Sequence, residues 1–248
     1  MTATPLPPTL AIAACVFLAS YVVGSIPFAY LIVRIVTGED ITSHGTGNVG
    51  SMNVRRTTGS WWWFALAVLG DGMKGLLPVA AAKALSGLAV LTPYGVAVGV
   101  AAPSFPPPGL GDSFLYLLTF PLPPLAVLGV VVGHNYSLWM ALIERRVTRT
   151  GKGLATGAGA LLVYDWRYFV AVVVVGLAVI ALTRYMMAGQ VAAALTLPLA
   201  ALVLHSPDWP FMLLMGALVY SAHHARFVGL LQGREPHLYV NDRMGPRG

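Results

Sequence analysis

The sequence predicts an all-α integral membrane protein with seven transmembrane helices, its N-terminus outside the cell and its C-terminus in the cytoplasm. Of its 248 residues, 57% are hydrophobic and only 10% are charged, whereas soluble domains carry about a quarter charged residues. Long apolar runs are separated by short polar loops, and most Lys and Arg residues fall in alternate loops. The length suits one domain covering residues 1–248.

The first apolar run, residues 9–33, contains 25 residues without a charge. This is long enough to cross a hydrocarbon core of about 30 Å. No Lys or Arg precedes it, so it lacks the basic region that opens a signal peptide. Arg34 follows at once, which places the first loop in the cytoplasm and the N-terminus outside.

Six more spans follow from the same pattern. Tryptophans at 61, 62 and 63 begin the second span and are typical of an aromatic belt at the membrane interface. The fourth and fifth spans are short and need flanking residues to cross. The six spans are expected at residues 61–82, within 113–143, 153–164, 168–183, 185–204 and 209–223.

Residues 84–102 are the ambiguous segment, because 19 uncharged residues are long enough to span. Prolines at 93, 103 and 106–108 favour an irregular external or re-entrant piece instead. An eighth span here would separate the basic residues 145–152 from 55 and 56, against the positive-inside bias. With seven spans, 12 of the 15 Lys and Arg residues face the cytoplasm, at positions 34, 55, 56, 145, 146, 149, 152, 184, 226, 234, 243 and 247.

The net charge of +6 indicates an anionic substrate or membrane lipid as partner. The basic residues form no continuous stripe or tail, so no nucleic-acid partner is expected. The single cysteine, Cys15, excludes an internal disulfide and a cysteine-based metal site. No His, Asp and Glu grouping suggests a metal, and no cofactor is expected.

The first polar loop contains Gly45, Gly47 and Gly50 in a G-x-G-x-x-G arrangement. The dinucleotide-binding fingerprint needs a buried strand before it, and here a membrane span and two acidic residues precede it. Such glycines still let backbone N–H groups turn inward to bind an anion. The neighbouring side chains Asn48, Asn53, Arg55 and Arg56 add donors. The alternative is an ordinary membrane turn with cytoplasmic positive charge.

A second loop, Thr150-Gly151-Lys152-Gly153, opens the fourth span. It does not match the Walker A pattern. A lysine between glycines before a helix N-terminus nevertheless suits a phosphate, because free N–H groups and the helix dipole both favour an anion. The alternative is a lysine that anchors the helix at the membrane surface.

Ionisable residues also occur inside the spans. Asp71 and Lys74, three residues apart, share one helical face and either neutralise each other or contact substrate. His134 is expected to be structural. His223 and His224 point to different sides of their helix, so they are poor joint metal ligands, although one suits a general base or a phosphate contact. In the seven-span arrangement, three cationic segments reach the same cytoplasmic face: residues 45–56, 149–153 and 223–226.

A set of ordered motifs covers nearly the whole chain. The motifs are Gly24-Ser25-Ile26-Pro27-Phe28-Ala29-Tyr30, the Gly-rich loop, Asp71-x-x-Lys74-Gly75, Gly133-His134, Gly151-Lys152-Gly153 with Ala155-Thr156, Thr183-Arg184-Tyr185 and Gly233-x-Glu235. Together they make it resemble the bacterial membrane family of acyl-phosphate:glycerol-3-phosphate acyltransferases. The resemblance implies a multi-pass protein of the bacterial inner membrane that transfers a fatty acyl group from acyl phosphate to glycerol 3-phosphate, giving lysophosphatidic acid.

The resemblance also implies the site residues. The family's serine, arginine, lysine and histidine fall at Thr46, Arg56, Lys152 and His223, which are the expected catalytic residues. Arg226 stands where the family has an asparagine. The expected substrate-binding residues are Gly45, Gly47, Asn48, Gly50, Asn53, Gly151, Gly153 and Arg226.

Further departures from the family pattern are Thr42, Ser51, Met52 and Thr150. They keep two alternatives open, a divergent paralogue with another acceptor and one without activity. A transporter of a phosphorylated metabolite is the other alternative, although transporters place their site near the membrane midplane. The sequence leaves acyl-chain preference and oligomeric state open.

Overall fold

The computed structural model describes residues 8–45, 47–89 and 121–235, which form α-helices, one 3₁₀ turn and their connections. The helices are α1 (Pro8–Gly24), α2 (Phe28–Thr37), α3 (Ser51–Thr58), α4 (Trp61–Ala89), α6 (Leu122–Asn135), α7 (Leu138–Glu144), α8 (Leu154–Tyr164), α9 (Trp166–Thr183), α10 (Met186–Val203) and α11 (Trp209–Leu231). The 3₁₀ turn η1 covers Ile41–Ser43.

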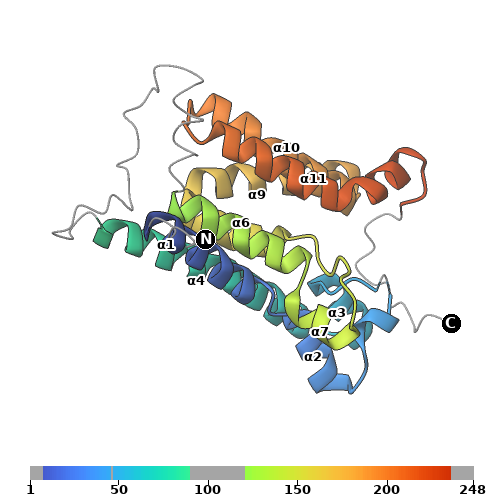
Figure 1. Ribbon diagram of the computed structural model, residues 1–248. Helices are drawn as coiled ribbons and strands as arrows, with labels where there is room; N and C mark the ends of the chain where they lie inside the picture. The colour runs from blue at the N-terminus through green and yellow to red at the C-terminus, as the bar shows by residue number, and fades with distance from the viewer. Residues whose placement is uncertain (1–7, 46, 90–120, 236–248) are drawn as a thin grey trace.

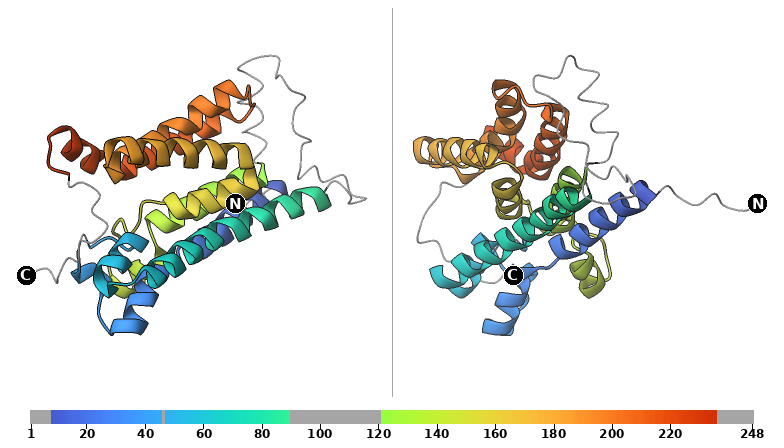
Figure 2. Two further views of the ribbon diagram at one scale, coloured as in Figure 1. Left: turned by 180° about the vertical axis from the view of Figure 1, so that it is seen from behind. Right: turned by 90° about the vertical axis from the view of Figure 1, so that its left-hand side faces the viewer.

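The long helices lie side by side in two groups (Figure 1). In one group α1 packs on α6, and α4 packs on both α6 and α8. In the other group α10 packs on α9 and α11, and α8 connects the two groups through α9. The short helices α2, α3 and α7 gather at one end of the bundle, here called the short-helix end (Figures 1 and 2).

Five helical segments are long and apolar enough to cross a membrane, so the chain is an integral membrane protein. They are Leu10–Thr37, Trp61–Ser86, Leu122–Glu144, Trp166–Thr183 and Met186–Val203. The predicted fourth and seventh spans correspond to α8 and α11, which are not among these five. α8 has only 11 residues, as the short apolar run indicated.

The first and third predicted spans are not single helices. α1 ends at Gly24 and α2 begins at Phe28, because Pro27 has no N–H to continue the helical ladder. A second break separates α6 from α7 at Tyr136 and Ser137. Side chains satisfy the carbonyls that the first break leaves free: Ser137 Oγ donates to Ser25 O at 2.5 Å, and Lys74 Nζ donates to Ile26 O at 2.6 Å.

Two predicted helix ends were too early. The second span was expected to end near residue 82, but α4 continues to Ala89, and Lys83 donates to the carbonyl of Val163 at 2.8 Å. The last span was expected to end at His223, but α11 continues to Leu231. Polar residues at a membrane surface do not by themselves end a helix. The segments 90–102 and 113–120, on which two predictions depended, lie outside the described residues.

Glycines let α4 and α8 approach closely. A Cβ at Gly75 would lie 2.0 Å from the carbonyl oxygen of Thr156, and one at Gly159 would lie 2.0 Å from that of Gly72. Small residues at such contacts are characteristic of helix pairs in membranes. This contact fixes α8, and therefore the loop that precedes it, against α4.

Candidate functional site

Three polar segments that are distant in sequence meet at the short-helix end. Val49 N in the first loop donates to Thr150 O in the second at 2.8 Å. Arg149 Nη1 donates to Ser221 O of α11 at 2.9 Å. The loop before α3, the loop before α8 and the C-terminal part of α11 therefore lie together, on one face as expected from the motifs.

The first loop folds around Asn53. Its Nδ2 donates to the carbonyls of Ile41 and His44, both at 3.0 Å, so this amide, which was predicted to bind substrate, closes the loop. Gly45 and Gly47 have φ of 51° and 68°, in the left-handed region that favours glycine. A Cβ on Gly45 would also lie 2.2 Å from Asn53 Oδ1. Thr46 lies outside the described residues.

The remaining donors of this loop are only partly accessible. Asn48 is half-buried, and its Nδ2 lies 2.8 Å from where a Cβ on Gly50 would be. Gly50 has extended backbone and precedes the first residue of α3. Gly50 therefore leaves room for the Asn48 amide at the N-terminus of that helix.

The adjacent arginines of α3 have different environments. Arg55 is buried and its guanidinium stacks over the Trp61 ring at 4.9 Å. Arg56 lies beside Gly45, with its Cδ 3.5 Å from the position of a Cβ there. The charge of Arg56 also acts on Lys152. Arg56 therefore lies beside the glycines of the first loop and within electrostatic reach of Lys152.

The second loop presents Lys152 at the N-terminus of α8. Gly153 is the N-cap, with φ of 77°. The first N–H groups of a helix have no helical partner and can bind an anion. Lys152 is half-buried. The pKa of its ammonium is lowered to about 8, chiefly by burial and also by the charges of Arg226 and Arg56, while Glu235 acts in the opposite direction. Gly151 is required by packing, because a Cβ there would lie 2.1 Å from His134 Nε2.

α11 supplies His223, which is 1% exposed. Its Nδ1 lies 2.7 Å from Val219 O, and a carbonyl only accepts, so Nδ1 carries the proton in the neutral ring. Nε2 is then a hydrogen-bond acceptor, and it has no partner among the described residues. As predicted, His224 points elsewhere: it is exposed and contacts the Tyr220 ring.

Arg226, three residues after His223, lies within electrostatic reach of both His223 and Lys152. Its guanidinium forms a two-point ion pair with Glu235, with Nε donating to Oε1 at 2.9 Å and Nη2 donating to Oε2. The sequence prediction gave Arg226 a phosphate-binding role and did not anticipate this carboxylate partner. Glu235 belongs to the Gly233-x-Glu235 motif, which was the available signal.

Asp71, Lys74 and His134 form a buried network beneath the second loop. Lys74 Nζ lies 2.8 Å from Asp71 Oδ1, so mutual neutralisation, one of the two interpretations, is observed. Nδ1 of His134 lies 3.1 Å from Thr156 Oγ1 and 3.8 Å from Asp71 Oδ1. His134 is therefore hydrogen-bonded and structural, as expected, and its ring packs against Gly151.

Sequence reasoning did not single out Asn135, the last residue of α6. It is fully buried, and both polar atoms of its amide lack a partner among the described residues. Its Oδ1 lies 3.1 Å from the position of a Cβ on Gly153. No motif identifies this residue, because its proximity to Gly153 depends on the packing of α6 against α8.

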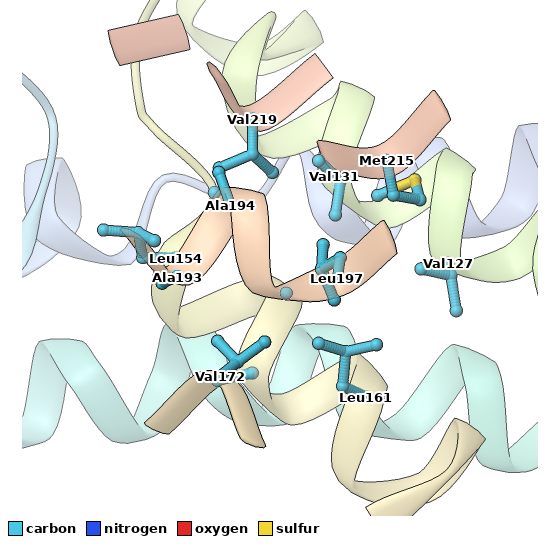
Figure 3. Close-up of a pocket in the computed structure, with 13 residues that line it drawn as sticks. Val127, Val131, Leu154, Leu161, Val172, Ala193, Ala194, Leu197, Met215 and Val219 are labelled. Atoms are coloured by element: carbon cyan, nitrogen blue, oxygen red, sulfur yellow. The ribbon is translucent and has the colours of Figure 1, made fainter. Parts of the chain in front are cut away.

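An apolar pocket opens beside the polar site (Figure 3). Its empty space is about 440 Å³, including its open mouth. Two of its lining residues border the polar site. Gly153 directly follows Lys152 in the chain, and the carbonyl of Val219 accepts a hydrogen bond from His223. The other lining residues come from α6, α8, α9, α10 and α11: Val127, Val131, Leu154, Gly157, Ala158, Leu161, Val172, Ala193, Ala194, Leu197 and Met215. Cationic groups thus adjoin a pocket with apolar walls.

Comparison with known proteins gives a consistent result. The family model described as glycerol-3-phosphate acyltransferase matches residues 14–233. A glycerol-3-phosphate acyltransferase of Gluconobacter oxydans is 33% identical over 229 residues, covering 90% of this chain and 92% of the relative. That of Desulforudis audaxviator is 32% identical, covering 87% and 90%.

The fold has solved counterparts. The crystal structure of PlsY (YgiH), an integral membrane glycerol 3-phosphate acyltransferase, in its glycerol 3-phosphate form, superposes with a TM-score of 0.68 at 24% identity. The alignment covers 92% of this chain and 96% of that one. The lysophosphatidic acid form superposes with a TM-score of 0.65 at 23% identity.

Proposed function

Because the chain belongs to the glycerol-3-phosphate acyltransferase family, we propose that it transfers a fatty acyl group to glycerol 3-phosphate and releases lysophosphatidic acid. We further propose that the acyl donor is acyl phosphate. The observation that carries the proposal is the cluster of Lys152, Arg56 and Arg226 beside an apolar pocket. Both substrates are anionic at one end, and the donor also carries a long hydrocarbon chain.

In the proposed reaction, a hydroxyl oxygen of glycerol 3-phosphate attacks the acyl carbonyl carbon of acyl phosphate. The bond from that carbon to the phosphate oxygen breaks, and inorganic phosphate leaves. The hydroxyl proton passes to the leaving phosphate or to His223, whose Nε2 is an unoccupied acceptor in the described structure. An activated donor needs mainly positioning and charge stabilisation.

The residues divide between the two substrates. Lys152 and the N–H groups at the start of α8 would hold the phosphate of glycerol 3-phosphate, supported by the N-cap geometry of Gly153. Arg56 and the first loop would hold acyl phosphate, with its chain in the apolar pocket. Thr46 would orient the attacking hydroxyl, and Arg226 would contribute to phosphate binding.

The direct test is to supply the purified protein with acyl phosphate and labelled glycerol 3-phosphate. The expected products are labelled lysophosphatidic acid and one equivalent of inorganic phosphate. The same protein given acyl-coenzyme A in place of acyl phosphate is the donor control and should give no product. Labelled glycerol 3-phosphate accumulating unchanged inside protein-containing vesicles would support the transporter alternative and contradict acyl transfer.

We also propose the finer topology: one domain of seven spans in the bacterial inner membrane, with α8 and α11 as the two spans beyond the five identified above. The N-terminus would lie outside, and the short-helix end would face the cytoplasm, as the basic residues suggest. α11 has 23 residues, which is enough to cross.

Cysteine labelling in intact cells tests this topology, with the native Cys15 replaced by alanine. Ser43→Cys and Val147→Cys place exposed thiols at the short-helix end, and Trp166→Cys places one at the opposite end of α8. A membrane-impermeant reagent should label only Trp166→Cys. Labelling of either Ser43→Cys or Val147→Cys from outside would contradict the seven-span arrangement.

A further inference from the structure

The break between α6 and α7 leaves backbone groups without helical partners. α6 ends at Asn135 and α7 begins at Leu138, so the carbonyl of His134 cannot accept from the usual residue four positions later. The N–H of Ser137, the N-cap of α7, likewise lies outside both helical ladders. Buried backbone groups of this kind require partners from elsewhere.

The hydroxyl of Thr150 supplies a partner to both. Thr150 Oγ1 donates to His134 O at 2.9 Å and accepts from Ser137 N at 3.4 Å. Thr150 is buried, with 5% of its surface exposed. Glycine or valine at this position would leave the carbonyl of His134 without this donor.

The backbone of Thr150 joins the two loops of the site. Its N–H donates to Asn135 O at 2.9 Å, and its carbonyl accepts from Val49 N at 2.8 Å. Val49 directly precedes Gly50, the N-cap of α3, which carries Arg56. Lys152 lies two residues after Thr150. One residue therefore connects the helix break, the segment carrying Lys152 and the segment carrying Arg56.

We propose that Thr150 is a positioning residue: its side-chain hydroxyl fixes the second loop on the break between α6 and α7, and its backbone carbonyl holds the first loop at that position. The proposal rests on the proposed function, in which each loop holds one substrate. Each substrate still meets its own loop when the hydroxyl is lost, but the two reacting groups are misaligned. Reaction between two bound molecules is sensitive to such displacement, where about 1 Å can cost on the order of a hundredfold in rate.

The test compares Thr150→Val, which keeps the shape and removes the hydroxyl, with Thr150→Ser, which keeps the hydroxyl. For Thr150→Val we expect kcat to fall about tenfold or more, while KM for each substrate changes by less than about threefold. Thr150→Ser should restore kcat to within about twofold of the wild type. Rates are normalised to folded protein, measured by gel filtration and thermal unfolding in detergent.

Three outcomes overturn the proposal: wild-type kcat in Thr150→Val, loss confined to KM, or a lower Tm with unchanged kcat per folded molecule. If Thr150→Val does not fold, Thr150→Ala replaces it and is judged by the same criteria. The wild-type reaction separates this proposal from the proposed function. An inactive wild type contradicts the function, whereas an active wild type with an equally active Thr150→Val contradicts only the positioning role.

Discussion

The lowered pKa of Lys152 leads to a specific pH dependence. The pKa falls from 10.5 to about 8, so the lysine is mostly charged at pH 7 and mostly neutral at pH 9. The charged form binds phosphate, and activity should therefore be present below pH 8 and lost above it. Because kcat/KM reports the free enzyme, it should fall by about tenfold for each pH unit well above 8.

The assay measures initial rates with labelled glycerol 3-phosphate between pH 7 and 9.5, with enzyme-free blanks for the hydrolysis of acyl phosphate. Bound phosphate favours the charged ammonium, so the corresponding fall in kcat should lie at higher pH than the fall in kcat/KM. Lys152→Arg keeps its charge throughout this range. Whatever its absolute rate, its kcat/KM should stay flat.

The variant Lys152→Ala measures how much the charged ammonium contributes to kcat/KM. Losing a charge-assisted hydrogen bond in Lys152→Ala should cost roughly 1.5–3 kcal/mol, which is about tenfold to a hundredfold in kcat/KM. The reasoning is refuted if kcat/KM of the wild type stays flat to pH 9.5. It is equally refuted if Lys152→Arg shows the same descending limb, or if Lys152→Ala retains wild-type kcat/KM.

Three other predictions test the remaining parts of the site. His223→Ala should lower kcat by roughly a hundredfold, because Nε2 of His223 has no hydrogen-bond partner among the described residues and can accept a proton from substrate. An unchanged initial rate would remove His223 from the mechanism. Arg226→Asn should raise KM for both substrates, because it removes a cation and leaves Glu235 unpaired. Adding Glu235→Gln to this variant should recover part of the lost affinity. Higher activity in Arg226→Asn would instead indicate redirected function. Gly157→Leu should shift preference toward shorter acyl chains, because Gly157 lines the apolar pocket and a Cβ there has room, with Val131 at 3.9 Å the neighbour found among the described residues. The control Leu162→Phe, on the exposed side of α8, should leave the preference unchanged. Equal chain-length profiles for wild type and Gly157→Leu would place the acyl chain elsewhere.

The membrane character of the chain followed directly from its sequence. Apolar runs long enough to cross a bilayer must be helical, because lipid offers no partner for backbone groups. The two cationic glycine motifs were also expected to share one face, and the hydrogen bond from Val49 to Thr150 brings their loops together. The separation of His223 from His224 followed from helical geometry, which places consecutive side chains about 100° apart.

Helix interruptions were harder to predict. The uncharged run of residues 122–143 indicated one span, although Asn135 and Ser137 are residues that favour a helix end and an N-cap. The break between α6 and α7 also depends on Ser25 and Thr150 from other segments. Pro27 was visible in the sequence. Lys74, which donates to the carbonyl exposed by that break, lies 48 residues away.

Sequence alone determined that the chain is a helical membrane protein and which loops combine glycines with cationic side chains, because both depend on local composition. Tertiary structure decided how the polar side chains are used. Asn53 closes its loop, Arg55 stacks on Trp61, Arg226 pairs with Glu235, and the charge of Arg56 acts on Lys152. These assignments depend on hydrogen-bond partners and burial supplied by distant segments, and such contacts exist only once the helices have packed.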